Sequence, residues 1–449
     1  MNEKNKMRSR YLFSPYANLY LKDGEKFEIY MDPLQWLRYN LNMKEEYKSP
    51  LKDILLSVFQ DKLHTLLYQF INGEGLSRRS ILLFPIFDRF TPSYSNLLED
   101  LLFLTKNLNR FADFQKSEAV LSINLNNITP VHISQVIATL YSDFENNVEM
   151  LNSSIKKKIV KNIKLFSNEI YLSYNPPFLK PIVDLKQFTE RHIREMLVDY
   201  YIHGSMATLD YVKGWSDVDT LMIIKRDIAT NAKKLLKLRR YAYEATKYFY
   251  CIDPLQHHGH FVLTEIDLAY YPQPYFPLVL FDYSLSFFGN NEIVIHERDC
   301  EIERLNTLWN TCYYFRKKYI LNKPITDIFE LKMFLHILQL LPLAYLQANG
   351  QYCYKKYSFD LVKKEFSEKD WTIIEKATKI RSEWQYKGVF NNILMRKIFE
   401  ILPNPKVYFM LNHVINKQIP KKVDEMLGKK YYEDTLQLAE QMLERGIKK

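Results

Sequence analysis

The segment 203–224 holds the residues whose types and spacing could do chemistry. It opens His-Gly204-Ser205, and after 11 intervening residues it continues as Asp217-Val-Asp219, followed by Thr220 and the apolar run Leu-Met-Ile-Ile. Glycine has no side chain, so an anion such as phosphate can approach its backbone closely. Carboxylates two residues apart on a strand point to the same face, where a cation such as Mg²⁺ relieves their repulsion. The segment therefore predicts a site for a metal ion and a phosphate group.

Each half of this pattern is common by itself, because a lone Gly-Ser is usually a turn and a lone Asp-X-Asp is usually a solvated loop. Their joint occurrence between two expected strands favours a binding site. We expect residues 206–210 to start a helix whose N-terminal amides face the same anion, and Ser216 to fix the turn before the first aspartate.

The elements that must position these residues follow from hydrophobic periodicity. Strands are expected over 198–203, 220–225 and 260–271, with a helix over 229–250, so the middle third is α/β or α+β. The chain to about residue 175 is expected to be mainly helical and shows no chemistry. The proline-rich run 174–181 is expected to interrupt regular structure as a linker. Further helices are expected over 50–72, 96–112, 133–149, 185–197, 305–321, 328–348, 368–385 and 424–445.

Composition restricts the class of protein. A chain of 449 residues with 47% hydrophobic residues and only 11 glycines is expected to fold into two or three globular domains. The net charge of +10 suits a partner that carries phosphates, or reflects a general richness in lysine. The cysteines Cys251, Cys300, Cys312 and Cys353 show no CxxC spacing, so neither a zinc site nor a disulfide framework is predicted.

Localisation is expected to be cytoplasmic, without a membrane partner. Residues 1–10 are charged and lack the apolar core of a signal peptide. The longest apolar stretch, 333–346, is too short to span a bilayer and contains His336, Gln339 and Pro342.

Around the segment 203–224, the sequence resembles the polymerase-β-like nucleotidyltransferase superfamily, which includes bacterial nucleotidyltransferase-domain proteins. The family signature is a hydrophobic residue, Gly, then Gly or Ser, a spacer, and Asp-hydrophobic-Asp or Glu. The matching residues are Ile202, Gly204, Ser205, Asp217, Val218 and Asp219. The resemblance covers residues 190–290 and, more loosely, a helical tail.

The resemblance implies an α+β fold with a small mixed β-sheet nucleotidyltransferase core flanked by helical domains. The implied division is a helical N-terminal domain over 1–180, a catalytic domain over 181–300, and a helical C-terminal domain over 301–449 that closes the cleft. The implied reaction transfers a nucleoside monophosphate from an NTP to an acceptor hydroxyl with two Mg²⁺ ions, or Mn²⁺ in their place. The acceptor stays open between a small molecule, a protein and RNA.

A third metal-binding carboxylate is expected on the strand over 260–271, where Asp267 is preferred to Glu265. Asp217, Asp219 and Asp267 are thus the expected catalytic and metal-binding residues. Gly204 and Ser205 are the expected nucleotide-binding residues on the sheet side.

Two further groups are weighed. Lys355 and Lys356, after a helix and a glycine, are candidate nucleotide-binding residues, with a solvated basic turn as the alternative; Arg381 is a weaker candidate. His257, His258 and His260 precede the same strand, and loop histidines near the acceptor are preferred to a zinc site.

Two other functions remain open. Asp217-Val-Asp219 could be the metal motif of a nucleotide-sugar-dependent glycosyltransferase, which does not require the upstream Gly-Ser. The chain could also be a catalytically inactive nucleotide-binding module, although nothing structural needs two like charges at that position.

Overall fold

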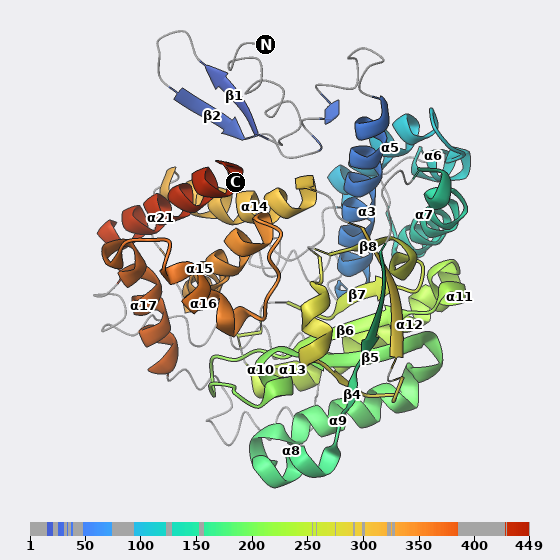
Figure 1. Ribbon diagram of the computed structural model, residues 1–449. Helices are drawn as coiled ribbons and strands as arrows, with labels where there is room; N and C mark the ends of the chain where they lie inside the picture. The colour runs from blue at the N-terminus through green and yellow to red at the C-terminus, as the bar shows by residue number, and fades with distance from the viewer. Residues whose placement is uncertain are drawn as a thin grey trace.

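A computed structural model describes the regions that carry the fold, and Figure 1 shows their arrangement. The described residues are 16–20, 26–30, 34, 37–38, 48–73, 94–122, 128–151, 157–253, 255–256, 258–273, 275–290, 292–298, 301–320, 325, 328–384, 427 and 429–448. His257 and Cys300, which were considered from sequence, lie outside them.

A small mixed sheet forms the centre of the molecule, and the fold is α+β. Its strand order is β4-β9-β5-β6-β7, with bounds Lys164–Leu165, Leu285–Ser286, Leu197–His203, Asp219–Ile224 and Phe261–Thr264. Strands β5 and β6 are antiparallel, whereas β6 and β7 are parallel. Both faces of β5 and β6 are buried, which explains their nearly continuous apolar runs.

Two smaller sheets complete the strands of the described chain. One has the order β3-β10-β8, with bounds Lys157–Asn162, Glu292–Arg298 and Tyr271–Pro272, and the other pairs β1 (Tyr16–Tyr20) with β2 (Lys26–Tyr30). The sequence analysis did not expect β1, β2 or β3, because strands of five or six residues give only a short pattern. The expected strand over 260–271 is divided between β7, a 3₁₀ turn at Asp267–Tyr270, and β8.

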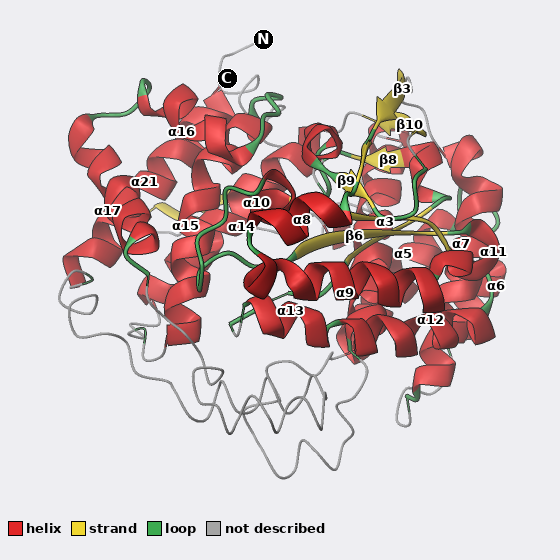
Figure 2. Cartoon of the chain, turned by 90° about the horizontal axis from the view of Figure 1, so that it is seen from below, coloured by secondary structure: helices red, strands yellow, loops and turns green. Residues whose placement is uncertain are grey.

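Helices cover the sheet and share a core with it. One apolar cluster joins the N-terminal helices to β5, β6 and the helices around them, so these parts pack as one body. Figure 2 shows α9, α12 and α13 running beside the strands. The helices of this body are α3 (Lys48–Asn72), α5 (Tyr94–Leu108), α6 (Gln115–Leu121), α7 (Pro130–Leu151), α8 (Asn168–Tyr174), α9 (Pro176–His192), α10 (Gly204–Thr208), α11 (Arg226–Ala229), α12 (Ala232–Ala245) and α13 (Lys247–Ile252).

The C-terminal helices form a second apolar cluster. Figure 1 shows these helices together on the left, beside the central sheet. They are α14 (Glu301–Ile320), α15 (Ile328–Ala348), α16 (Lys355–Lys363), α17 (Glu368–Ser382) and α21 (Lys429–Lys448). Trp215 and Leu255, from the sheet side, belong to this cluster. The ring centroids of Trp215 and Trp384 lie 4.9 Å apart in an edge-to-face contact.

Two sequence-based expectations change. The proline-rich run interrupts regular structure only at Asn175, between α8 and α9, and does not form a linker. Helix α9 begins at Pro176, because the first helical residue needs no N–H donor, and it continues through Pro181. The apolar stretch near 333–346 belongs to a longer helix, and Glu330–Ala348 is long and apolar enough to cross a membrane by length and composition. Most of it is buried inside the protein, as in the core helix of a globular fold.

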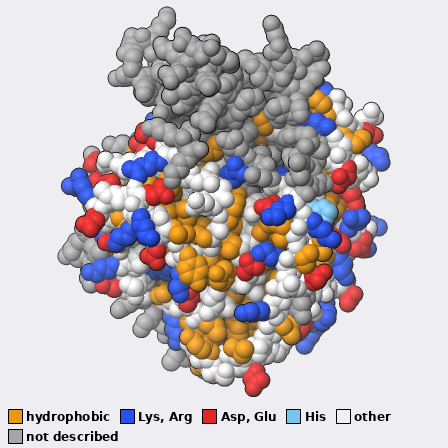
Figure 3. All heavy atoms as spheres, in the orientation of Figure 1, with side chains coloured by type: hydrophobic (Ala, Val, Ile, Leu, Met, Phe, Trp, Pro, Cys, Tyr) orange, Lys and Arg blue, Asp and Glu red, His pale blue; other side chains and the backbone are white. Residues whose placement is uncertain are grey.

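The surface in Figure 3 mixes charges of both signs with apolar side chains that gather in the centre and the lower part of this face. The lower part is where α8 lies in the same orientation (Figure 1), and Leu165, Ile170 and Tyr174 are among the exposed apolar residues of the chain.

A buried ion pair links the two bodies and generates a stability prediction. Lys332 of α15 pairs with Asp253, and both side chains are almost fully buried. Lys332→Met should lower the free energy of unfolding by about 3–5 kcal/mol, because Asp253 would stay buried without its partner. Adding Asp253→Asn should restore most of the loss in urea denaturation. The control is Lys363, which forms an exposed ion pair with Glu375. Lys363→Met should change the free energy of unfolding little. Equal effects at the two lysines would contradict the prediction.

Candidate metal centre

Asp217 and Asp219 meet Gly204 at one end of the central sheet. Asp219 is the first residue of β6 and pairs with His203, the last residue of β5. Gly204 follows with a φ of +66°, and a Cβ built there would lie 2.3 Å from Oδ2 of Asp219. Any larger residue would therefore displace this carboxylate, which is why the motif needs glycine. The expected helix after it exists as α10, but it has only five residues.

The segment between the two carboxylates is held by Gln256. Its side-chain Oε1 accepts a hydrogen bond from the Val218 N–H at 3.0 Å, and its Nε2 donates to the Val218 carbonyl at 3.2 Å. Nε2 also donates to the His258 carbonyl at 3.0 Å. On the other side, the Val212 N–H donates to Ser216 Oγ at 2.9 Å, which confirms the expected turn. One buried amide thus ties the Asp217–Asp219 segment to the start of β7.

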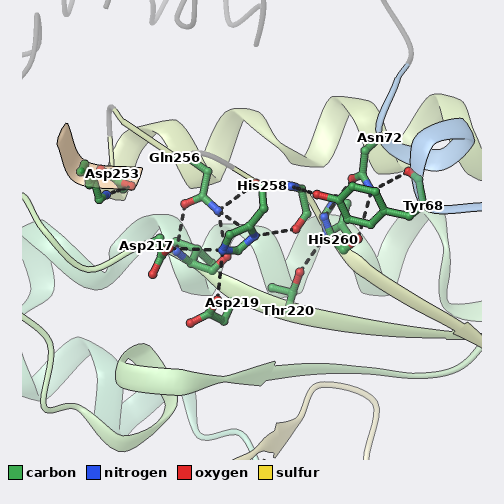
Figure 4. A network of polar contacts seen from close by, with 12 residues as sticks. Tyr68, Asn72, Asp217, Asp219, Thr220, Asp253, Gln256, His258 and His260 are labelled. Carbon is green, nitrogen blue, oxygen red and sulfur yellow. Dashed lines mark hydrogen bonds and ion pairs between the residues drawn. The ribbon is translucent and has the colours of Figure 1, made fainter. Parts of the chain in front are cut away.

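His258 lies between the two carboxylates (Figure 4). Its Nε2 is 3.2 Å from Oδ2 of Asp217 and 3.1 Å from Oδ1 of Asp219, and its Nδ1 is 3.0 Å from the Gly259 carbonyl. Burial would lower the pKa of His258, but the hydrogen bonds and charges of both aspartates outweigh it and raise this pKa well above its ordinary value. Ligand atoms of these three side chains all lie within 4.8 Å of one another, close enough to hold one ion.

Helix α3 positions this segment from the N-terminal part of the chain. Asn72 at its end donates to the His260 carbonyl at 3.0 Å and accepts from the His260 N–H at 2.9 Å. The Tyr68 hydroxyl accepts from the Gly259 N–H at 3.0 Å. A Cβ at Gly259 would lie 2.0 Å from Oδ1 of Asn72, so the close approach needs glycine. The N-terminal helices, in which the sequence showed no chemistry, therefore support the site (Figure 4).

His260 has a structural role instead. Its Nδ1 lies within hydrogen-bond distance of the Tyr200 and Thr220 hydroxyls, and its Nε2 is 3.0 Å from the Ala242 carbonyl. Burial lowers the pKa of His260 to about 3, so the ring is neutral at pH 7.

His203 is buried beside Asp219 with an unused nitrogen. Its Nε2 has no hydrogen-bond partner among the described residues. Burial lowers the pKa of His203 to about 4, against the opposite effect of Asp219. A buried polar nitrogen normally has a hydrogen-bond partner, so Nε2 of His203 stays available at this position.

Two cations approach from the C-terminal helices. Burial and the neighbouring Arg381 lower the pKa of Lys355 to about 8, against the attraction of Asp217 and Asp219. Nε of Arg381 is buried without a hydrogen-bond partner among the described residues, and its charge acts on Asp217. Lys356, by contrast, is exposed and lies 3.3 Å from Asp210. The structure thus brings Lys355 to the site and leaves Lys356 at its margin.

The expectation that Asp267 completes the metal site is wrong in this structure. Thr264 of β7 pairs with Ile224, five residues beyond Asp219 and about 16 Å along the strand at roughly 3.3 Å per residue. Asp267 follows beyond that point, fully buried, and accepts hydrogen bonds from Thr264. Burial by itself would raise the pKa of Asp267. His64, whose Nε2 lies 2.8 Å from Oδ1 of Asp267, outweighs this effect, and the pKa of Asp267 is lowered.

Glu265 lies at the same far end and is exposed, where its side chain accepts from the Arg226 N–H at 3.0 Å. The third side chain beside Asp217 and Asp219 that could hold a metal is His258, which the sequence analysis had placed in a loop near the acceptor. The signal that could have found it is the helix between β6 and β7. A helical crossover makes consecutive strands parallel, so the start of β7 lies beside the start of β6.

The arrangement offers two carboxylates and an imidazole to a divalent ion, with two cations available for the phosphates of a ligand. Mixed oxygen and nitrogen ligands of this kind fit a metal ion that keeps open positions for substrate. No protein-family model, curated protein or solved structure matches this chain. The chemistry of the site therefore rests on its own residues.

The neutral state of His260 generates a prediction for the pH dependence of stability. Its folded pKa lies below the unfolded value near 6.5, so the unfolded chain binds the extra proton and acid favours unfolding in this window. His260→Gln should make the fall in unfolding free energy between pH 6.5 and 5 shallower by up to about 1.4 kcal/mol per pH unit. The exposed His132→Gln should leave the slope unchanged. Parallel slopes for wild type and His260→Gln in urea denaturation would rule the prediction out.

Proposed function

We propose that this protein is a metal-dependent nucleotidyltransferase that transfers a nucleoside monophosphate from an NTP to an acceptor hydroxyl. The observation that carries the proposal is the meeting of Asp217, Asp219 and Gly204 at one sheet end, with Lys355 and Arg381 facing it. A glycosyltransferase motif would need only the two aspartates, whereas nucleotidyl transfer also accounts for the close approach of Gly204 to Asp219.

In the proposed reaction, the acceptor oxygen bonds to the α-phosphorus while the bond to the bridging oxygen breaks. Pyrophosphate leaves, and the hydroxyl proton is released. Divalent ions bound at Asp217 and Asp219 would supply charge stabilisation to the attacking and leaving oxygens. Lys355 and Arg381 would bind the triphosphate and neutralise charge on the leaving pyrophosphate. Gln256 would act through Val218 by keeping the two aspartates in register.

The direct test is incubation of the full chain with each α-labelled NTP, Mg²⁺ or Mn²⁺, and a cell extract separated into protein, RNA and small molecules. Label should enter one fraction. Asp217→Asn and Asp219→Asn should each lower the rate by at least about 100-fold, because each removes a metal-binding charge worth several kcal/mol. Glu265→Gln, at the far end of β7, is the matched control and should stay active. Activity retained in either aspartate variant would refute the mechanism. Label in no fraction with any of the four NTPs would refute the function.

Lys355 and Lys356 form a natural pair for a second test, since they are neighbours with different surroundings. Lys355→Met should raise the KM for the NTP by about 10–100-fold, because a charged hydrogen bond contributes roughly 1.5–3 kcal/mol. Lys356→Met, which removes only an exposed pair with Asp210, should change KM by less than about threefold. Steady-state kinetics with the nucleotide varied makes the comparison. A larger rise in KM for Lys356→Met than for Lys355→Met would contradict the prediction and would place the phosphates on the exposed side of α16, where Lys356 lies.

A further inference from the structure

We infer that the metal centre of Asp217, Asp219 and His258 prefers a divalent transition metal such as Mn²⁺ to Mg²⁺. This inference rests on the metal-binding half of the proposed function and deepens it. Its basis is that the third ligand position beside the two aspartates is held by an imidazole nitrogen and not by a carboxylate.

The spacing of the three side chains fits a shared ion. Two ligands at right angles around an ion with bonds of about 2.1 Å are about 3 Å apart. Nε2 of His258 lies 3.2 and 3.1 Å from the nearest oxygens of Asp217 and Asp219. A divalent ion that enters here replaces the proton on Nε2 of His258, which is released to solvent, and needs only small movements of the side chains.

The orientation of His258 is the one that metal-binding histidines adopt. Such a histidine usually donates its other ring N–H to a carbonyl or carboxylate, which directs the free nitrogen to the metal. Nδ1 of His258 lies 3.0 Å from the Gly259 carbonyl, so Nε2 is the nitrogen that faces the aspartates. Gln256 and Tyr68 bind the carbonyl and the N–H of the peptide group that joins this histidine to Gly259 (Figure 4).

His203 is a second, independent observation. Its unpartnered Nε2 is buried, and the residue pairs with Asp219 across the strands. The rings of His203 and His258 both lie against Phe261, with centroids 5.8 and 5.4 Å from the centroid of the Phe261 ring. A site that places two imidazoles beside two carboxylates has more nitrogen than Mg²⁺ favours.

Metal chemistry then decides the preference. Mg²⁺ demands oxygen ligands in a near-ideal octahedron and gives up its water reluctantly. Imidazole suits transition metals, while Mn²⁺ also accepts carboxylate and phosphate oxygens. Mn²⁺ is therefore the probe that the ligand set and a triphosphate substrate can both satisfy.

The test measures binding of Mn²⁺ to the full chain without nucleotide. Pulsed electron paramagnetic resonance should detect ¹⁴N coupling to the bound Mn²⁺, and at least a tenfold excess of Mg²⁺ should be needed to displace half of it. His258→Ala should abolish the coupling from this ring and weaken Mn²⁺ binding at least tenfold. His258→Asp should bring the two metals close to equal affinity, because it supplies a third carboxylate. The exposed His132→Ala is the control and should match the wild type.

Absence of ¹⁴N coupling, or equal affinity of the wild type for both metals, would overturn the inference and leave His258 as a counter-charge for the aspartates. Nucleotide transfer with Mg²⁺ in that case would preserve the proposed function. Conversely, nitrogen-coupled Mn²⁺ in a chain that transfers no nucleotide would preserve the metal preference and remove the function. Loss of folding in His258→Ala would be seen by circular dichroism, and His258→Asp would then decide.

Discussion

The structure of the site depends on holding two like charges side by side at the start of β6. Asp217 and Asp219 repel one another, and partial burial makes the repulsion stronger, so folding must supply positive charge to the same place. Without a metal ion, a protonated His258 supplies it from the start of β7, and Lys355 and Arg381 supply more from the C-terminal helices. A divalent ion bound beside the aspartates would take over this role and release the proton of His258. The carboxylate pair is therefore the point at which the separate parts of the chain are brought together.

The local half of this arrangement could be predicted from the sequence. An apolar run after Asp219 predicts a buried strand, and the period of two in a strand places both carboxylates together. The third side chain of the candidate metal centre could not be found in the same way, because its place depends on the direction of β7. Reading the acids of β7 without its direction led to Asp267, whereas the parallel crossover places His258 beside Asp219. Strand direction is a property of the connection and not of the strand.

The contribution of the N-terminal helices was invisible for a related reason. Periodicity predicts α3 and its buried face, and the structure confirms both. Nothing in that pattern shows that Asn72 will hold the backbone of His260, since the two residues are 188 positions apart in the chain. A helix with no chemistry of its own can thus hold the segment that carries His258, through two hydrogen bonds from the Asn72 side chain to the His260 backbone.

The candidate metal centre is also linked to the C-terminal helices. Trp215 stands two residues before Asp217, and its ring packs among those helices against Trp384. Val218, one residue after Asp217, is held to the sheet side by Gln256. Asp217 therefore lies between Trp215, which packs against the C-terminal helices, and Val218, which is bound by Gln256. Asp219 is instead fixed by strand pairing with His203. The position of Asp217 relative to Asp219 therefore depends on how the C-terminal helices pack against Trp215.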